Sequence, residues 1–133
     1  MIKKIMNETN TGFMRHIGGL EFEKIDENNY SFSFVVKEIH LNNGKIAHGG
    51  FLSTIADTGM GTAAHIVSNK KCVTISLEIK FISAALINQK LIGKVKIQKK
   101  TKSLVFITCE ILNSESVVVT ASGVWKILRS LKN

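Results

Sequence analysis

The segment GKIAHGGFLSTIADTGMGTAAH, residues 44–65, holds the residue types whose spacing could do chemistry. Asp57 is its one carboxylate and lies within a run of small and apolar residues. An ionised carboxylate in such surroundings is costly unless it is hydrogen-bonded, paired or open to a wet cleft. Acids held in this way are enriched at functional sites, which makes Asp57 a candidate catalytic group. In the structural alternative, hydrogen bonds from nearby backbone or from Thr54 and Thr58 satisfy the carboxylate.

The turn His48-Gly49-Gly50 precedes Asp57 and opens the same run. Its glycines let other groups approach the backbone, and free N–H groups at a helix N-terminus bind anions and can form an oxyanion hole. A carbonyl oxygen held there becomes partly negative when it is attacked, and a carboxylate further along can attack or activate a water molecule. The combination predicts acyl transfer, with a plain helix-entry turn as the simpler interpretation.

One long helix over residues 50–67 is predicted to carry Asp57. The block has helical length and little strand alternation, and it is small or apolar around most of its circumference, which is typical of a buried helix. Gly59 and Gly61 each cost about 0.8–1 kcal/mol in a helix interior. Their presence indicates close packing against the backbone, by a partner helix or a slender ligand.

Strands are predicted on both sides of this helix. Residues 20–25 and 30–36 form two short strands around the turn DENN, after a short helical piece near the N-terminus. Further strands are predicted over residues 73–81, 91–100, 104–112 and 117–128, joined by tight polar connections. In the first of these the alternation places one set of residues on the apolar face: Val73, Ile75, Leu77, Ile79 and Phe81. The pattern predicts a single α+β domain over residues 1–133, in which a mostly antiparallel sheet of about five or six strands wraps around one long central helix.

Length and composition limit the class of protein. A chain of 133 residues with 44% hydrophobic content fits one compact domain. No apolar run is long enough for a membrane span or a signal peptide, so we expect a cytoplasmic protein that does not enter a membrane. Cys72 and Cys109 lie in apolar stretches, as expected of buried reduced thiols, and no metal site or cofactor is expected.

The net charge of +8 favours anionic partners such as nucleic acid, an acidic membrane surface or a phosphate-bearing small molecule. The densest basic cluster is KVKIQKKTK, residues 94–102, which a solvated strand face also explains. There is no RNA-stacking aromatic pattern and no zinc-finger spacing. The sign of the charge alone does not choose among these partners, and a solvated strand face rich in lysine is the favoured first interpretation.

The segment LNNGKIAHGGFLSTIADTGMGTAA resembles the motif of hot-dog-fold acyl-CoA thioesterases of the phenylacetic-acid-degradation (PaaI-like) type. In that family an Asn, a Gly, HGG and then an Asp inside the central helix recur at these spacings. The resemblance extends through VTISLEIKFISAA, IGKVKIQKKTKSLVFITCEILN and VVVTASGVWKI, and so covers residues 12–128. It implies a hot-dog fold, in the same order of elements that the periodicity predicts, and hydrolysis of an acyl-CoA thioester.

The resemblance also implies a role for individual residues. Asp57 would be the catalytic carboxylate, as general base or nucleophile. The N–H of Gly49 would polarise the thioester carbonyl, and His48 would shape the turn, for which a structural hydrogen bond to backbone is the alternative. Asn42 would hold the attacking water or the thioester. Thr74 lies where many members carry a serine near the acid, and it keeps the hydroxyl but adds a methyl group.

Family members pair through their long helices and form a continuous sheet, with Asp57 of one subunit facing the His-Gly turn of the other. We therefore expect a homodimer or a dimer of dimers, in which Gly59 and Gly61 are close-packing positions. Ala84 departs from the proline that the family often shows, which would alter the rim of the acyl pocket.

The resemblance places a basic strand end and hairpin near the nucleotide of coenzyme A, which belongs to the substrate and is no separate cofactor. The residues concerned are Lys99, Lys100, Lys102 and Ser103. Thioester hydrolysis is the leading hypothesis. The alternatives are a non-catalytic acyl-CoA or fatty-acid binder with the same fold and, less favoured, a basic nucleic-acid-binding protein.

Overall fold

The computed structural model describes residues 9–129. In chain order the elements are helix α2 (Gly12–His16), strands β1 (Glu21–Lys24) and β2 (Asn29–Val35), the 3-10 turn η1 (Glu38–His40), helix α3 (Gly49–Ser68), and strands β3 (Cys72–Phe81), β4 (Lys90–Lys100), β5 (Leu104–Leu112) and β6 (Val117–Ile127). Every predicted strand and the long helix are present, with ends that differ from the predicted ones by one residue at most.

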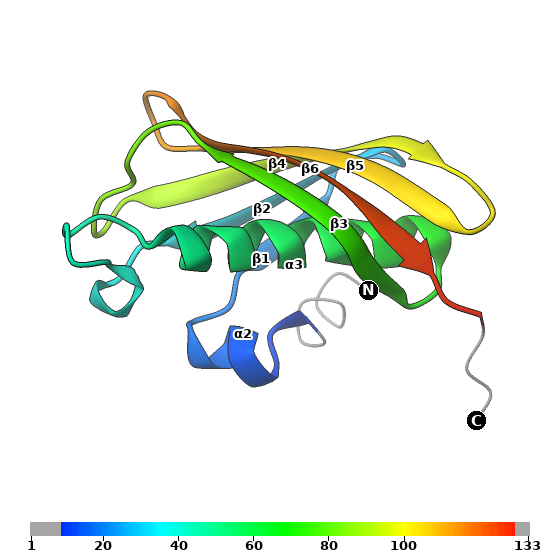
Figure 1. The fold of residues 1–133 in the computed structure, drawn as a ribbon, viewed down its shortest axis with the longest axis horizontal. Helices are drawn as coiled ribbons and strands as arrows, with labels where there is room; N and C mark the ends of the chain where they lie inside the picture. The colour runs from blue at the N-terminus through cyan, green and yellow to red at the C-terminus, as the bar shows by residue number, and fades with distance from the viewer. Residues whose placement is uncertain (1–8, 130–133) are drawn as a thin grey trace.

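The six strands form one antiparallel sheet in the order β1-β2-β4-β5-β6-β3. Figure 1 shows this sheet curved over α3, with α2 on the opposite side of the helix. The expected α+β arrangement is confirmed. Strand β3 is a sheet edge of ten residues, with no partner strand on its outer side within residues 9–129. No helix in that range is long and apolar enough to cross a membrane.

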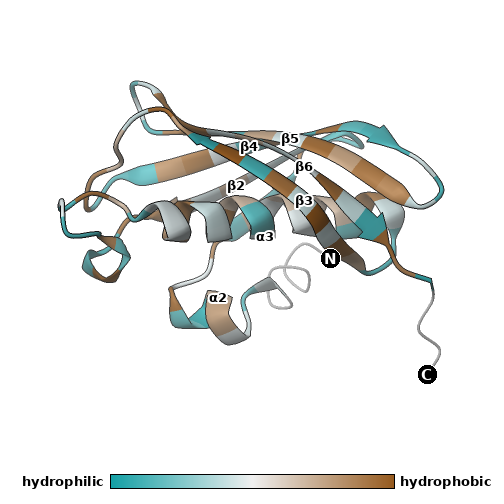
Figure 2. Ribbon diagram, in the orientation of Figure 1, coloured by the Kyte–Doolittle hydropathy of each residue, from teal (hydrophilic) through white to brown (hydrophobic). Residues whose placement is uncertain are grey.

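The core lies between α3 and the inner face of the sheet. On β2 and the residue after it, alternate side chains form a buried apolar face: Tyr30, Phe32, Phe34 and Val36. Strand β4 likewise alternates between buried and exposed positions, and β5 between buried and mostly half-buried ones. Figure 2 shows this alternation as bands of brown and teal along the strands. Full burial of a large apolar side chain contributes about 1.5–3 kcal/mol, so this face holds helix and sheet together.

The glycines of α3 accommodate aromatic rings from the sheet. The ring of Phe32, 1% exposed, lies where Cβ atoms at Gly59 and Gly93 would be, so it is clamped between α3 and β4. At Gly61 a Cβ would lie 3.2 Å from the indole nitrogen of Trp125 on β6. The prediction of close packing is confirmed, but the packing partner is the chain's own sheet. Within one protomer no second helix or ligand is needed to explain these glycines.

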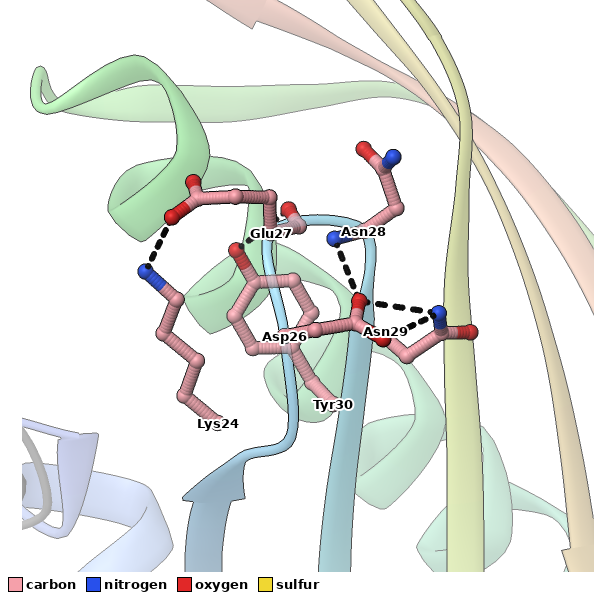
Figure 3. A network of polar contacts seen from close by, with 6 residues as sticks. All are labelled: Lys24, Asp26, Glu27, Asn28, Asn29 and Tyr30. Carbon is pink, nitrogen blue, oxygen red and sulfur yellow. Dashed lines mark hydrogen bonds and ion pairs between the residues drawn. The ribbon is translucent and has the colours of Figure 1, made fainter.

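The β1–β2 hairpin has a polar network confined to six residues (Figure 3). The Asp26 carboxylate accepts hydrogen bonds from the Asn28 backbone N–H at 2.9 Å and from the Asn29 side chain. These donors lower the pKa of Asp26. Tyr30 donates its hydroxyl proton to the Glu27 carbonyl at 3.1 Å. The bond from the Asn28 N–H to Asp26 is typical of an Asx turn, and it fixes the turn DENN through its own residues.

Strand β3 differs from the prediction in its side-chain direction. Its ladder with β6 shifts register between Thr74 and Ser76, so Ile75 is the extra residue of a β-bulge. Val73 and Ile75 are 47% and 57% exposed, and the predicted single apolar face from residue 73 to residue 81 is wrong for this half of the strand. Thr74 pairs with the buried Trp125, which places both side chains on the inner face. Beyond the bulge the predicted face resumes, because Leu77 and Ile79 pack against the core.

Candidate active site

The turn before α3 is held by its own histidine. His48 is the N-cap residue, and its Nδ1 accepts a hydrogen bond from the Gly50 N–H at 2.8 Å. The His48 carbonyl accepts from the Leu52 N–H at 3.0 Å. Because Nδ1 is an acceptor, the neutral ring carries its proton on Nε2, and this N–H is left as a donor on an exposed side chain. His48 therefore makes the structural bond to backbone that was the alternative, and its Nε2 has no partner among residues 9–129.

The first N–H of the helix belongs to Gly49 and has no acceptor within residues 9–129. The free N–H groups of a helix N-terminus carry partial positive charge and stabilise an oxyanion. The ring of Phe81, at the end of β3, lies 3.2 Å from the position that a Cβ at residue 49 would take. A glycine at this position thus leaves room for the aromatic ring beside the start of the helix.

Asn42 shapes the loop that leads into this turn. Its Oδ1 accepts from the backbone N–H groups of Gly44 and Ile46, at 2.8 and 3.3 Å. Its backbone N–H donates to the Ile46 carbonyl at 2.8 Å. The amide oxygen is thus committed to the loop. The Nδ2 group remains available as a donor within the described part of the chain.

Asp57 lies half-buried in the middle of α3, and its partner comes from β3. The hydroxyl of Thr74 donates to Oδ1 of Asp57 at 2.7 Å. The structural alternative named Thr54 and Thr58 instead. The hydroxyl of Thr54 donates to the Gly50 carbonyl at 2.9 Å, and no bond from Thr58 to Asp57 occurs within residues 9–129. No donor within residues 9–129 contacts Oδ2. The carboxylate is thus oriented through one oxygen and open at the other.

The β-bulge makes this contact possible. Without an extra residue in β3, a strand that turns Leu77 and Ile79 inward would turn Thr74 outward, because side chains alternate with period two. With the bulge at Ile75, both halves of β3 face α3. Next to the bulge, opposite Leu77, lies Gly123, where a Cβ would be 2.6 Å from the Ser76 carbonyl oxygen. A side chain at residue 123 would therefore collide with the bulged backbone.

Two half-sites result, and they are separated along the helix. The first is the turn with the free Gly49 N–H, and the second is Asp57 with Thr74. Asp57 follows Gly49 by eight residues, a rise of about 12 Å along the helix at 1.5 Å per residue. Reacting atoms must approach to about 3–3.5 Å. A single thioester carbon therefore cannot be served by both half-sites of one protomer.

The predicted nucleotide-binding residues divide into two groups. Lys102 and Ser103 line a hollow of about 510 Å³ at the end of the sheet, whereas Lys99 and Lys100 belong to β4 and do not line it. The hollow brings in three cations that the sequence analysis missed, because they come from other segments: Lys70, Lys126 and Arg129. Among the residues that the structure describes, no carboxylate lines it. Its wall is near the second half-site, since Val73, adjacent to Thr74, pairs with Lys126.

The two cysteines and the possible metal ligands offer no second reactive centre within residues 9–129. Burial raises the pKa of the Cys109 thiol to about 12, so it stays protonated and inert. Cys72 is half-buried, and both cysteines are free. No cluster of three His, Cys, Asp or Glu side chains that could hold a metal ion occurs in residues 9–129.

Comparison with known proteins gives consistent results. A sequence model of the Thioesterase superfamily matches residues 44–120. PA0474, a candidate esterase of Pseudomonas aeruginosa, is 32% identical over 94 residues, which are 69% of this chain and 70% of that protein.

The structural likenesses extend over nearly the whole chain. The PaaI protein from the phenylacetic acid degradation operon of Escherichia coli has a TM-score of 0.86 at 21% identity, covering 97% of this chain and 92% of that one. Thioesterase superfamily member 2 of zebrafish has a TM-score of 0.85 at 20% identity, covering 96% of both chains. A hypothetical thioesterase of Streptococcus pneumoniae, solved with coenzyme A, has a TM-score of 0.78 at 23% identity, covering 85% and 93%. The fold is thus a hot-dog fold, and the chain belongs to the thioesterase superfamily.

Proposed function

We propose that this protein hydrolyses an acyl- or aryl-CoA thioester to the free acid and coenzyme A, with Asp57 as general base or nucleophile. The observation that carries the proposal is the pair of half-sites: a free Gly49 N–H at the start of α3, and a carboxylate that Thr74 orients through one oxygen only. Membership in the thioesterase superfamily and the P. aeruginosa relative support hydrolysis in general.

In the general-base route, Oδ2 of Asp57 takes a proton from a water molecule as the water oxygen bonds to the thioester carbon. The carbonyl electron pair moves onto oxygen, where the Gly49 N–H stabilises the negative charge. When the carbonyl re-forms, the carbon–sulfur bond breaks and the thiolate of coenzyme A leaves and is protonated. In the nucleophilic route, Asp57 itself attacks and forms a mixed anhydride, which water then hydrolyses.

Completion of the site requires a second copy of the chain. The separation of about 12 Å along α3 keeps the two half-sites of one protomer apart. A two-fold dimer would set Asp57 of one protomer against the Gly49 turn of the other and would create two equivalent sites. The free outer edge of β3 and its exposed Val73, Ile75 and Phe81 suit such a contact, because unpaired edge strands pair readily.

The basic hollow is the proposed place for the nucleotide of coenzyme A. Its cations Lys70, Lys102 and Lys126 carry the charge that the phosphates of the nucleotide need, and they lie next to the strand that carries Thr74. The solved S. pneumoniae relative contains coenzyme A, which supports this class of substrate.

The test is an assay for free coenzyme A thiol over phenylacetyl, hydroxybenzoyl, short-chain and long-chain acyl-CoAs, on the native protein and Asp57→Asn. The amide has nearly the same shape but is neither base nor nucleophile, so kcat should fall by about 10²–10⁴-fold. Asp26→Asn is the matched control, because it makes the same chemical change in the β1–β2 hairpin. Thiol release that persists in Asp57→Asn would remove Asp57 from the chemistry. Tight acyl-CoA binding without release by the native protein would indicate a binder.

A further inference from the structure

His40 is the one buried basic side chain within residues 9–129, at 4% exposed. It uses both ring nitrogens: Nδ1 accepts a hydrogen bond from the Lys37 N–H at 2.9 Å, and Nε2 lies 2.7 Å from the Ile17 carbonyl. Because a carbonyl can only accept, Nε2 carries the proton, and the acceptor Nδ1 does not. The ring is therefore neutral, in agreement with the effect of burial, which lowers its pKa.

The same residue contacts the candidate active-site turn in two ways. Its ring stacks on Phe51 in the first turn of α3, with centroids 3.7 Å apart and planes inclined by 9°. Its backbone carbonyl accepts from the N–H of His48 at 2.8 Å. A shift of His40 would move both the cap and the first turn of the helix, and with them the free Gly49 N–H.

On its other side, His40 holds the turn between α2 and β1. Gly18 and Gly19 in this turn have φ values of +105° and +71°. Beside the turn is a cavity of about 400 Å³, lined in part by Ile17, Gly19, Phe34 and His40 itself. The hydrogen bond from His40 to the Ile17 carbonyl joins this turn to η1 beside the cavity.

We propose that His40 is a positioning residue for the hydrolysis proposed above, on which this inference rests. Its neutral ring ties the turn between α2 and β1 to the His48-Gly49 turn and fixes where the Gly49 N–H points. An oxyanion donor acts only if it lies at hydrogen-bond distance from the developing charge, and a misplacement of about 1 Å can cost on the order of 100-fold in rate.

Three substitutions separate the contacts of the ring. His40→Gln can place an N–H where Nε2 lies, so it keeps the bond to Ile17. His40→Asn can place an oxygen where Nδ1 lies, so it keeps only the bond from Lys37. His40→Phe keeps the stacking on Phe51 and loses both hydrogen bonds.

Kinetics with the best acyl-CoA of the panel should show the lowest kcat for His40→Phe, about 10- to 100-fold below native, with KM changed by less than about threefold. His40→Gln should recover kcat to within about fivefold of native, and His40→Asn should resemble His40→Phe. Tyr30→Phe is the matched control, since it removes one bond from a buried ring to a backbone carbonyl, that of Glu27, in the β1–β2 hairpin. Its kcat should equal the native value at a temperature where all variants are folded.

Amide hydrogen exchange gives a measurement that does not depend on turnover. The His48 N–H should exchange faster in His40→Phe than in native protein and His40→Gln, and at the native rate in Tyr30→Phe. Native kcat in folded His40→Phe, or an unchanged exchange rate at His48, would overturn the proposal. Absence of thiol release by the native protein would instead contradict the proposed function, and exchange at His48 would still decide whether His40 positions the turn.

Discussion

Polar side chains in the β1–β2 hairpin and in the candidate active site both form hydrogen bonds, but their partners lie at different separations along the sequence. In the hairpin, Asp26 and Tyr30 find their partners within three residues. At the candidate site, Asp57 finds Thr74 seventeen residues away, and His40 finds Ile17 at a distance of twenty-three residues. The side-chain hydrogen bonds of the first network stay within the hairpin. The second one orients polar groups and leaves some of them free.

The free groups are what separates the two regions functionally. Within residues 9–129 the Gly49 N–H and Oδ2 of Asp57 have no partner, whereas the Asp26 carboxylate accepts through both of its oxygens. A satisfied network contributes stability and nothing else. A network that fixes one atom of a group and leaves the other open prepares it for a ligand. Substitutions should therefore affect stability in the hairpin and turnover at the candidate site.

The largest effect is expected from removal of the Gly49 N–H itself. Gly49→Pro deletes this donor at the first helical position, which proline favours, and His48 already has the extended backbone required before a proline. Loss of one oxyanion donor should lower kcat by about 10²–10³-fold. Gly49→Ala is the matched control, because it keeps the N–H and also places a Cβ against the Phe81 ring. Equal activities of the two variants would show that the N–H has no role.

Mixed dimers test whether the half-sites combine across subunits. In a dimer of one Asp57→Asn chain and one Gly49→Pro chain, one site has both half-sites intact and the other has neither. Equal mixing would give half mixed dimers with one working site each, and so about a quarter of native activity. Unfolding and refolding the two variants together, with each refolded alone as control, measures this. No recovery in a verified mixed dimer would place the whole site within one chain and would contradict the separation along α3.

A smaller effect is expected at Thr74, where substitution should lower kcat, whereas substitution in the hairpin should lower stability. Thr74→Val removes the hydroxyl that donates to Asp57, and loss of a hydrogen bond to a charged group should lower kcat by about tenfold. Thr74→Ser should keep native activity. Tyr30→Phe should instead lower the free energy of unfolding by about 1 kcal/mol and leave kcat unchanged. Kinetics and urea unfolding of all three variants check this contrast. A Tyr30→Phe variant with a lowered kcat and a native free energy of unfolding would contradict it.

The separation of interacting residues along the chain also explains which features the sequence could predict. The helix carrying Asp57 and the six strands follow from local periodicity, and the turn DENN follows from its residue types. The bulge at Ile75 does not, because the alternation from Val73 to Phe81 is unbroken in the sequence and the room for the bulge comes from Gly123 on another strand. The pairing of Asp57 with Thr74 came from family resemblance, since nothing local joins them. His40 was missed because its partners lie on three separate segments.

The smallest effect concerns the pH dependence of stability at His40. Burial is the main cause of the lowered pKa, and the charge of Lys37 adds to it, while the hydrogen bond to the Ile17 carbonyl opposes both. As the pH falls through about 6.5, the unfolded chain takes up a proton before the native state does, so this residue's contribution is complete above that pH and is lost below it. His40→Gln cannot titrate, so the Tm advantage of native protein over this variant should be larger at about pH 7.5 than at about pH 5.5. Thermal unfolding of both proteins across this range measures it, and His16, His48 and His65 cancel because both chains contain them. An advantage that grows toward acid would mean that the native ring is stabilised by protonation, which the bond from the Lys37 N–H to Nδ1 forbids.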